Sequence, residues 1–186
     1  MNERHLDSGG FELRPLVAAD AAAYREVRLA GLAESPFAFS ESHEDECMKS
    51  VAEFARFVQA VGDPPERFTL GAFAGQQLVG FATFARDQRS KARHKGMVYA
   101  MYTVADWRGR GVGSAVMKEL LRQARRLVGL EQIHLWVLHA ETSATPFYQR
   151  VGFHSQGTRV VGDLKVGDRY VDAEYMVLRL ADGGVQ

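Results

Sequence analysis

The sequence predicts a single α/β domain built on one mixed sheet. Segments rich in β-branched and aromatic residues alternate with segments whose apolar residues recur at helical spacing. Residues 97–104, 112–127 and 133–138 have the patterns of strand, helix and strand, which is the order of a parallel crossover unit. Short turns join other neighbouring strands, and this favours antiparallel pairing there. No repeat, linker or low-complexity segment interrupts this order.

The composition is that of an ordinary globular protein. The 186 residues are 46% hydrophobic and 25% charged. Lys and Arg number 23, as do Asp and Glu, so the chain lacks the basic excess of a nucleic-acid binder. It has no run of 18 apolar residues for a membrane span, and the single Cys47 suits a reducing cytoplasm. We expect a cytoplasmic domain over 11–180, with a disordered amino-terminal tail at 1–10, a carboxyl-terminal tail at 181–186, and no nucleic-acid or membrane partner.

The first third of the domain is expected to contain a strand and a helix before an irregular segment. Residues 11–16 predict a strand, and Pro15 within them favours an edge position. Asp20 can cap a helix that runs to about Ala33. The acidic residues 34–46 have no period, so we expect a connecting loop there.

A second helix and a hairpin follow. Ser50 and Glu53 have the spacing of a capping box before an apolar series, and Gly62 is the expected stop. Residues 68–73 and 78–85 predict two strands of a hairpin. The next segment, 86–96, carries five basic residues against one acid, a pattern typical of a solvated loop.

The carboxyl-terminal part is expected to complete the sheet. The crossover helix should end at Gly129, and the continuously apolar residues 133–138 predict a strand buried on both faces. Thr142 or Ser143 can cap a helix that ends near Arg150. Closing strands are expected around Phe153, at 160–161 and over 169–180, with a turn at 162–167.

A glycine-rich loop connects the central strand to the crossover helix. It reads Arg108-Gly-Arg-Gly-Val-Gly113. The first turn of a helix offers backbone N–H groups without intrahelical partners, and glycines let an anion approach them. The loop therefore indicates a diphosphate site. Its spacing fits neither the Rossmann G-x-G-x-x-G fingerprint nor a P-loop.

Two motifs carry a family resemblance. Arg108-x-x-Gly111-x-Gly113 after a strand resembles the Q/R-x-x-G-x-G/A acetyl-CoA loop of the GNAT superfamily of N-acetyltransferases. The preceding residues 101–108 are similar to that family's L-Y-V-x-P-x-x-R, and residues 144–153 resemble its A-x-x-F-Y-x-x-x-G-F. The resemblance runs from 11 to 180, although outside these motifs it covers only the order of elements.

The resemblance implies a mostly antiparallel mixed sheet, flanked by helices, with a central splayed parallel strand pair. Acetyl-CoA would be the co-substrate, its pantetheine arm lying in the splay, and no metal is expected. The residues implied to hold acetyl-CoA are Met101, Tyr102, Thr103, Arg108, Gly109, Arg110, Gly111, Val112, Gly113 and Ser114. Arg108 and Arg110 can equally be exposed loop cations.

The resemblance also implies a general acid and leaves the general base open. Tyr148 stands at the motif tyrosine, whose phenol can protonate a departing thiolate. Glu141 stands where the family has an asparagine, and Trp136 stands where some members have a catalytic glutamate. Chemistry alone allows Glu141 as base, and equally a further set of side chains: His139, His134, Glu41, His43 and Glu44.

We expect an N-acetyltransferase that joins an acetyl group to the primary amine of a small molecule or peptide by direct attack in a ternary complex. The implied acceptor pocket comprises Tyr24, Arg28, Phe37, Glu41 and Glu44, whose carboxylates favour a cationic amine. The alternative is an acyl-CoA-binding sensor of the same fold without turnover. An exposed final strand can pair across a dimer axis, so a homodimer is also considered.

Overall fold

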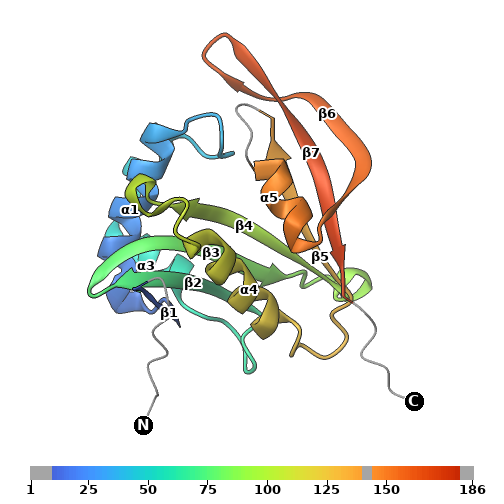
Figure 1. Cartoon of the computed structure of the whole chain (residues 1–186), viewed down its shortest axis with the longest axis horizontal. Helices are drawn as coiled ribbons and strands as arrows, with labels where there is room; N and C mark the ends of the chain where they lie inside the picture. Colours follow the sequence, from blue (N-terminus) through green and yellow to red (C-terminus); the bar gives the residue numbers. More distant parts are fainter. Residues whose placement is uncertain (1–9, 140–143, 181–186) are drawn as a thin grey trace.

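A computed structural model of the chain describes residues 10–139 and 144–180. These residues form a seven-stranded sheet in the order β1-β2-β3-β4-β5-β7-β6, with helices packed against it (Figure 1). The strands are β1 (Glu12–Pro15), β2 (Arg67–Ala74), β3 (Gln77–Arg86), β4 (Lys95–Thr103), β5 (Gln132–Leu138), β6 (His154–Val166) and β7 (Arg169–Arg179). The α-helices are α1 (Ala21–Glu34), α2 (His43–Cys47), α3 (Val51–Val58), α4 (Val112–Ala124) and α5 (Ala144–Val151). Three short 3₁₀ turns span Ala18–Asp20, Ser90–Ala92 and Ala105–Trp107.

Two hydrophobic cores cover the two faces of the sheet. On one face α4 buries an apolar stripe that includes Val116 and Leu120 against strands β2, β3 and β5. On the other face α1 and α3 pack around Tyr24, Phe54 and Phe81. Burial of this apolar surface provides the main drive for folding. The alternating strand and helix patterns in the sequence are therefore confirmed as one α/β domain.

The only parallel pair among the described strands is β4 with β5, and it is short. Its register joins Lys95 to Gln132 and Met97 to His134, and no pairing follows. Beyond that point β4 continues beside β3, as far as Thr103, and β5 continues beside β7, as far as Leu138. The two strands thus separate toward their carboxyl ends, which confirms the predicted splayed pair.

A bulge in β4 lies at the point where the strands separate. The β3–β4 register passes from Thr83↔Tyr99 to Phe81↔Tyr102, so β4 contains one extra residue. Ala100 within the bulge has φ of 51°, an unusual backbone conformation for a residue with a side chain. Such conformations cost about 1–3 kcal/mol and cluster at functional sites. The bulge redirects the backbone of Ala100 and Met101 at the opening of the sheet.

Two expectations for the amino-terminal half need correction. Asp20 precedes α1, but its carboxylate makes no cap to that helix; it accepts hydrogen bonds from Arg14 and from Val17 N. The acidic segment 34–46 is not a continuous loop, because α2 begins within it at His43. Ser42 caps α2 by accepting from Asp45 N at 3.0 Å, a local signal that the lack of periodicity obscured.

The predicted basic loop is neutralised internally. Glu66 accepts hydrogen bonds from Arg86 and Arg93, and Asp87 pairs with Arg89. Most of the positive charge of 86–96 is therefore held against acids of the same chain. These ion pairs leave little free positive charge at 86–96, and free positive charge is what a phosphate-binding surface needs.

The carboxyl-terminal strands also differ from expectation. The expected turn at 162–167 lies largely inside β6, and the chain reverses after Val166. Gly162, which suggested a turn, has a positive φ and lies at a register shift within β6, and a second shift lies near Gly157. The edge strand is β6, whereas the final strand β7 lies between β5 and β6. The crossover helix α4 ends at Ala124, before Gly129.

Strand β5 is less buried than its apolar sequence predicts. Ile133, Leu135 and Val137 face the α4 core, but Trp136 is 43% exposed. The pairing of β4 with β5 ends at Met97 and His134. The rest of β5, which includes Trp136, therefore lines a cavity instead of pairing with β4.

Close packing at Gly96 gives a stability prediction. A Cβ at Gly96 would lie 2.5 Å from Cζ of the buried Phe84 ring, so Gly96→Ala overpacks the core beneath β4. Overpacking costs about 1–3 kcal/mol, and each kcal/mol lowers Tm by about 2–4 °C in a domain of this size. Thermal unfolding followed by circular dichroism should show this decrease. An unchanged Tm would mean that Phe84 moves aside freely.

Among the described residues, no helix is long and apolar enough to cross a membrane.

Candidate functional site

The loop before α4 presents an open helix amino terminus. Gly109 and Gly111 have φ of 73° and 84°, and Gly111 is the N-cap of the 13-residue helix α4. A Cβ built at either position would meet nothing within 4 Å. These glycines are therefore required by the backbone conformation and leave free space in front of the first-turn N–H groups. This open helix terminus is suited to binding an anion, which would accept hydrogen bonds from the main-chain N–H groups of Val112, Gly113 and Ser114.

Arg108, a predicted cofactor residue, is engaged elsewhere in the structure. Its guanidinium donates to both carboxylate oxygens of Glu34 at 2.9 and 2.7 Å and to Thr103 O at 3.0 Å. Tyr102 donates its phenol to the same carboxylate at 2.5 Å. Arg108 and Tyr102 together lower the pKa of Glu34. This cluster fastens the start of the glycine loop to the end of α1.

Arg110 and Gly113, which were also predicted to hold acetyl-CoA, lie against neighbouring side chains. Arg110 lies over the Trp107 ring, with its Cζ 5.0 Å from the ring centroid. A Cβ at Gly113 would approach the Met101 and Thr103 side chains at 3.3 and 3.5 Å. The glycine loop therefore packs directly on the splayed end of β4.

A cavity of about 300 Å³, here called the α5 cavity, opens where β4 and β5 separate. Its wall comes from the end of α1, the segment after it, β5 and α5: Glu34, Ser35, Pro36, Phe37, Ala38, Trp136, Val137, Leu138, Ala144 and Tyr148. The Tyr148 hydroxyl donates to Sδ of Met101 at 3.6 Å, a contact that joins α5 to β4. Burial raises the pKa of Tyr148 to about 12, so the phenol stays protonated at neutral pH.

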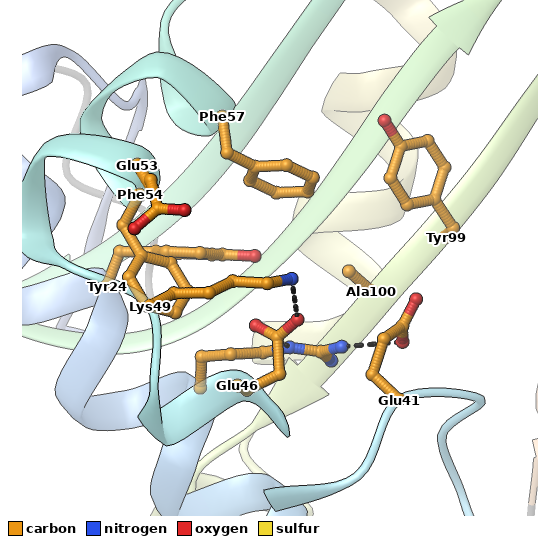
Figure 2. A pocket seen from close by; sticks show the side chains of 10 residues that line it. Tyr24, Glu41, Glu46, Lys49, Glu53, Phe54, Phe57, Tyr99 and Ala100 are labelled. Carbon is orange, nitrogen blue, oxygen red and sulfur yellow. Dashed lines mark hydrogen bonds and ion pairs between the residues drawn. The ribbon is translucent and has the colours of Figure 1, made fainter. Parts of the chain in front are cut away.

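A second cavity, of about 250 Å³, lies between α1, α3 and β4 and is here called the α1–α3 cavity (Figure 2). It is lined by Tyr24, Arg28, Glu41, Glu46, Lys49, Glu53, Phe54, Phe57, Tyr99 and Ala100. The structure thus brings together three of the predicted acceptor residues, Tyr24, Arg28 and Glu41. It places Phe37 in the α5 cavity and Glu44 on the exposed first turn of α2.

The charged groups of the α1–α3 cavity form one network. Arg28 Nη2 donates to Glu41 at 2.8 Å, and Arg28 Nε lies 3.9 Å from Glu46. Lys49 donates to Glu46 at 2.5 Å (Figure 2). Arg28 is only 4% exposed, and its Nη1 has no hydrogen-bond partner among the described residues. Since a buried donor is normally paired, Nη1 is an unusual feature of the cavity.

The β4 bulge connects the two cavities. Ala100 lines the α1–α3 cavity, and the next residue, Met101, contacts Tyr148 of the α5 cavity. Glu41 lines the same cavity as Ala100 (Figure 2). A reacting group held at the bulge is therefore reachable from both cavities.

The structure separates the candidate bases. Glu141 lies outside the described residues. His139 pairs with Glu174 at 2.9 Å, and His134 is 4% exposed and bonded to Tyr175 and Gln132. His43 begins α2 and does not line either cavity. Of the described candidates, only Glu41 faces a cavity next to the bulge.

The buried His134 gives a pH prediction. Burial, with smaller effects of Lys95 and His94, lowers the pKa of His134 to about 4 from its ordinary 6.5. The unfolded chain therefore binds a proton that the folded protein excludes, and His134 contributes stability that decreases as pH falls from 6.5 toward 4. His134→Gln should flatten this part of the pH dependence of the unfolding free energy, measured by urea titration. Parallel curves for the two proteins would contradict a neutral His134.

Several wall residues were missed by sequence reasoning. Lys49 lies between α2 and α3, Phe54 and Phe57 lie on α3, and no signal in the sequence places these residues beside β4. Glu46, in the acidic segment 34–46 that was expected to contribute carboxylates, lines this cavity, whereas Glu44 does not. Only the presence of α2, with Glu46 on its buried side, distinguishes the two.

No three His, Cys, Asp or Glu side chains lie close enough to hold a metal ion within the described ranges 10–139 and 144–180.

The splayed β4–β5 pair and the glycine loop before α4 are the two features that the resemblance to acetyl-CoA-dependent acyltransferases implied. The sequence model of the acetyltransferase (GNAT) family matches residues 29–153. The chain belongs to this family, and it is an acyltransferase that uses acetyl-CoA and an amine acceptor.

Comparisons with individual proteins agree with this assignment. The chain is 30% identical over 118 residues to the L-amino acid N-acetyltransferase AaaT of Escherichia coli strain K12, covering 63% of this chain and 72% of the relative. A GNAT acetyltransferase structure from Streptococcus pneumoniae superposes with a TM-score of 0.78 at 22% identity, covering 91% of this chain and 99% of that one. A phosphinothricin acetyltransferase from Sinorhizobium meliloti, in complex with AcCoA, gives 0.78 at 23% identity, covering 95% and 92%. Both structures share the fold.

Proposed function

We propose that this protein moves an acetyl group from acetyl-CoA to the primary amine of a small molecule bound in the α1–α3 cavity. The observation that carries the proposal is the β4 bulge, whose residues Ala100 and Met101 face the α1–α3 cavity and Tyr148 respectively. An amine entering from one side can meet an acyl group held from the other. Holding both in one ternary complex turns a bimolecular reaction into an effectively intramolecular one.

Acetyl-CoA supplies an activated thioester. Its diphosphate is assigned to the main-chain N–H groups of residues 109–114, and its amide-bearing arm to the unpaired edge of β4 at 101–103. The open space before Gly109 and Gly111 supports the first assignment. The lack of β4–β5 pairing after Met97 supports the second, because an unpaired strand edge offers hydrogen-bond partners to extended amides.

The transfer needs two proton movements. The neutral amine attacks: a C–N bond forms as the C–S bond breaks, the nitrogen then loses one proton, and the thiolate gains one. Tyr148 is the proposed donor to sulfur, because its half-buried phenol remains protonated and lies beside Met101. Glu41, 52% exposed in the cavity that Ala100 also lines, is the described carboxylate best placed to receive the amine proton. Glu141 remains a second candidate base from the sequence.

Two of the relatives compared above are named for small acceptors. AaaT is named for L-amino acids and the Sinorhizobium meliloti enzyme for phosphinothricin. The α1–α3 cavity, at about 250 Å³, is smaller than the roughly 300–1,000 Å³ clefts that hold drug-sized ligands. A compact amine matches that volume. We place the reaction in the cytoplasm, in line with the single cysteine.

The direct test is release of free thiol from acetyl-CoA across a panel of amines, with mass spectrometry of the products. Turnover with a small primary amine and formation of its N-acetyl derivative is expected. Binding of coenzyme A without thiol release from any amine would favour an acyl-CoA sensor and reject the proposed reaction.

A further inference from the structure

The α1–α3 cavity contains a donor that the proposed acetyl transfer does not use. Arg28 projects from α1 and is 4% exposed. Its Nη2 donates to Glu41 at 2.8 Å, its Nε lies 3.9 Å from Glu46, and the guanidinium face lies 4.7 Å from the Phe39 ring centroid. Its Nη1 has no partner within the described part of the chain. A guanidinium edge with an unused N–H is suited to a carboxylate.

The remaining charges of the cavity fit a ligand that carries both signs. Arg28 and Lys49 line the wall together with Glu41, Glu46 and Glu53. Lys49 is paired with Glu46, and Glu53 is held in the capping box of α3 by Ser50. Glu41 is different, because it is half exposed and uses Oε2 for Arg28. Arg28 therefore keeps one buried donor without a partner among the described residues, and Glu41 keeps one carboxylate oxygen that Arg28 does not use.

We infer that the acceptor is an α-amino acid with an apolar side chain, whose carboxylate binds Arg28 Nη1 and whose amino group is held by Glu41 beside Ala100. This inference rests on the proposed acetyl transfer. The ammonium and carboxylate of an α-amino acid are attached to one carbon, so they lie side by side with opposite charge. The Arg28–Glu41 pair has the complementary arrangement, with its charges 2.8 Å apart.

The rest of the wall indicates what the amino acid carries. Tyr24, Phe54, Phe57 and Tyr99 provide aromatic surface, and Tyr24 and Phe54 are almost completely buried. Aromatic walls favour apolar groups, which gain by leaving water. Acetylation removes the positive charge of the amine, so the product loses its attraction to Glu41 and is released more easily than the substrate is bound.

The test compares three amines that differ only at the carboxylate. They are L-leucine, L-leucinamide and isoamylamine, with spermidine and a short peptide as other amine classes. The kcat/KM for leucine should exceed that for leucinamide by about 10- to 100-fold, the range expected for one hydrogen bond between charged groups. In addition, 4-methylpentanoate should compete with leucine, whereas its amide should not.

Arg28→Gln should reduce the ratio of kcat/KM for leucine to kcat/KM for leucinamide from about 10–100 to about 1. A purely structural role for Arg28 would lower both substrates alike and preserve their ratio. Glu44→Gln is the matched control, since Glu44 is an exposed acid outside the cavity, and it should preserve the ratio. If Arg28→Gln does not fold, the substrate series and the 4-methylpentanoate competition on the unaltered protein still decide the question.

Equal turnover of leucine and leucinamide would overturn the inference, as would turnover of spermidine or the peptide without turnover of leucine. Both of those results would leave acetyl transfer intact. Absence of thiol release with every amine would instead reject the proposed function itself.

Discussion

Tyr148→Phe should lower kcat by about 100-fold or more while leaving coenzyme A affinity unchanged. General acid catalysis typically contributes about 10²–10⁴ in rate, and the substitution removes only the hydroxyl that donates to Met101 Sδ. The ring keeps its packing against Phe147 and Phe153, so the fold should be retained. Steady-state thiol release and calorimetric titration of coenzyme A measure the two quantities.

The control for this variant is Tyr170→Phe, because Tyr170 is 64% exposed on β7 and lines neither cavity. It should retain normal kcat. Burial raises the Tyr148 pKa to about 12, so its donor form persists at every working pH, and no loss of rate from this group is expected below that value. Full activity of Tyr148→Phe would remove the phenol from the mechanism.

Gly111→Asp should weaken coenzyme A binding by about 100-fold or more. The new carboxylate would stand at the N-cap of α4, in the open space where the diphosphate is proposed to bind. Two like charges about 4 Å apart near a protein surface repel by about 4 kcal/mol, and each 1.4 kcal/mol changes affinity tenfold. Isothermal calorimetry at low salt measures the change.

Gly75→Asp separates this electrostatic effect from backbone strain. Gly75, in the β2–β3 turn, has φ of 60° and also has nothing within 4 Å of a built Cβ. Asp is among the residues that best tolerate such backbone angles, so both variants should fold. Gly75→Asp should bind coenzyme A normally. Equal weakening by both variants would indicate a general loss of stability and would refute the assigned diphosphate site.

The fold was largely predictable because the sequence patterns that indicate its helices, strands and turns each lie within a short segment of the chain. Ser50 and Glu53 form the capping box that their spacing indicated, and the strands joined at 75–76 form the predicted hairpin. The β4–α4–β5 unit followed from the change between strand and helix periods. The prediction was wrong where a glycine suits two conformations, because glycine occurs both in turns and at bulges within strands. Gly162 and Gly167 indicated a turn over 162–167, yet the long hairpin β6–β7 accommodates Gly162 at a register shift within β6.

The site was less predictable because its contacts join distant segments. The pairing of Arg108 with Glu34 spans 74 positions, and nothing near either residue indicates it. The same holds for Lys49, Phe54 and Phe57, which reach the cavity only because α3 packs against α1. Motif resemblance identified the glycine loop and Tyr148 without these contacts. It gave no information on Arg28 Nη1, which only the packed structure shows to lack a partner among the described residues.

A crystal structure with coenzyme A bound tests the central assignment most directly. We expect the diphosphate against the main-chain N–H groups of 109–114, the amide arm between β4 and β5, and the sulfur near the Tyr148 hydroxyl and the Ala100 bulge. Coenzyme A bound at any other surface, or with its sulfur remote from Tyr148, would contradict the account.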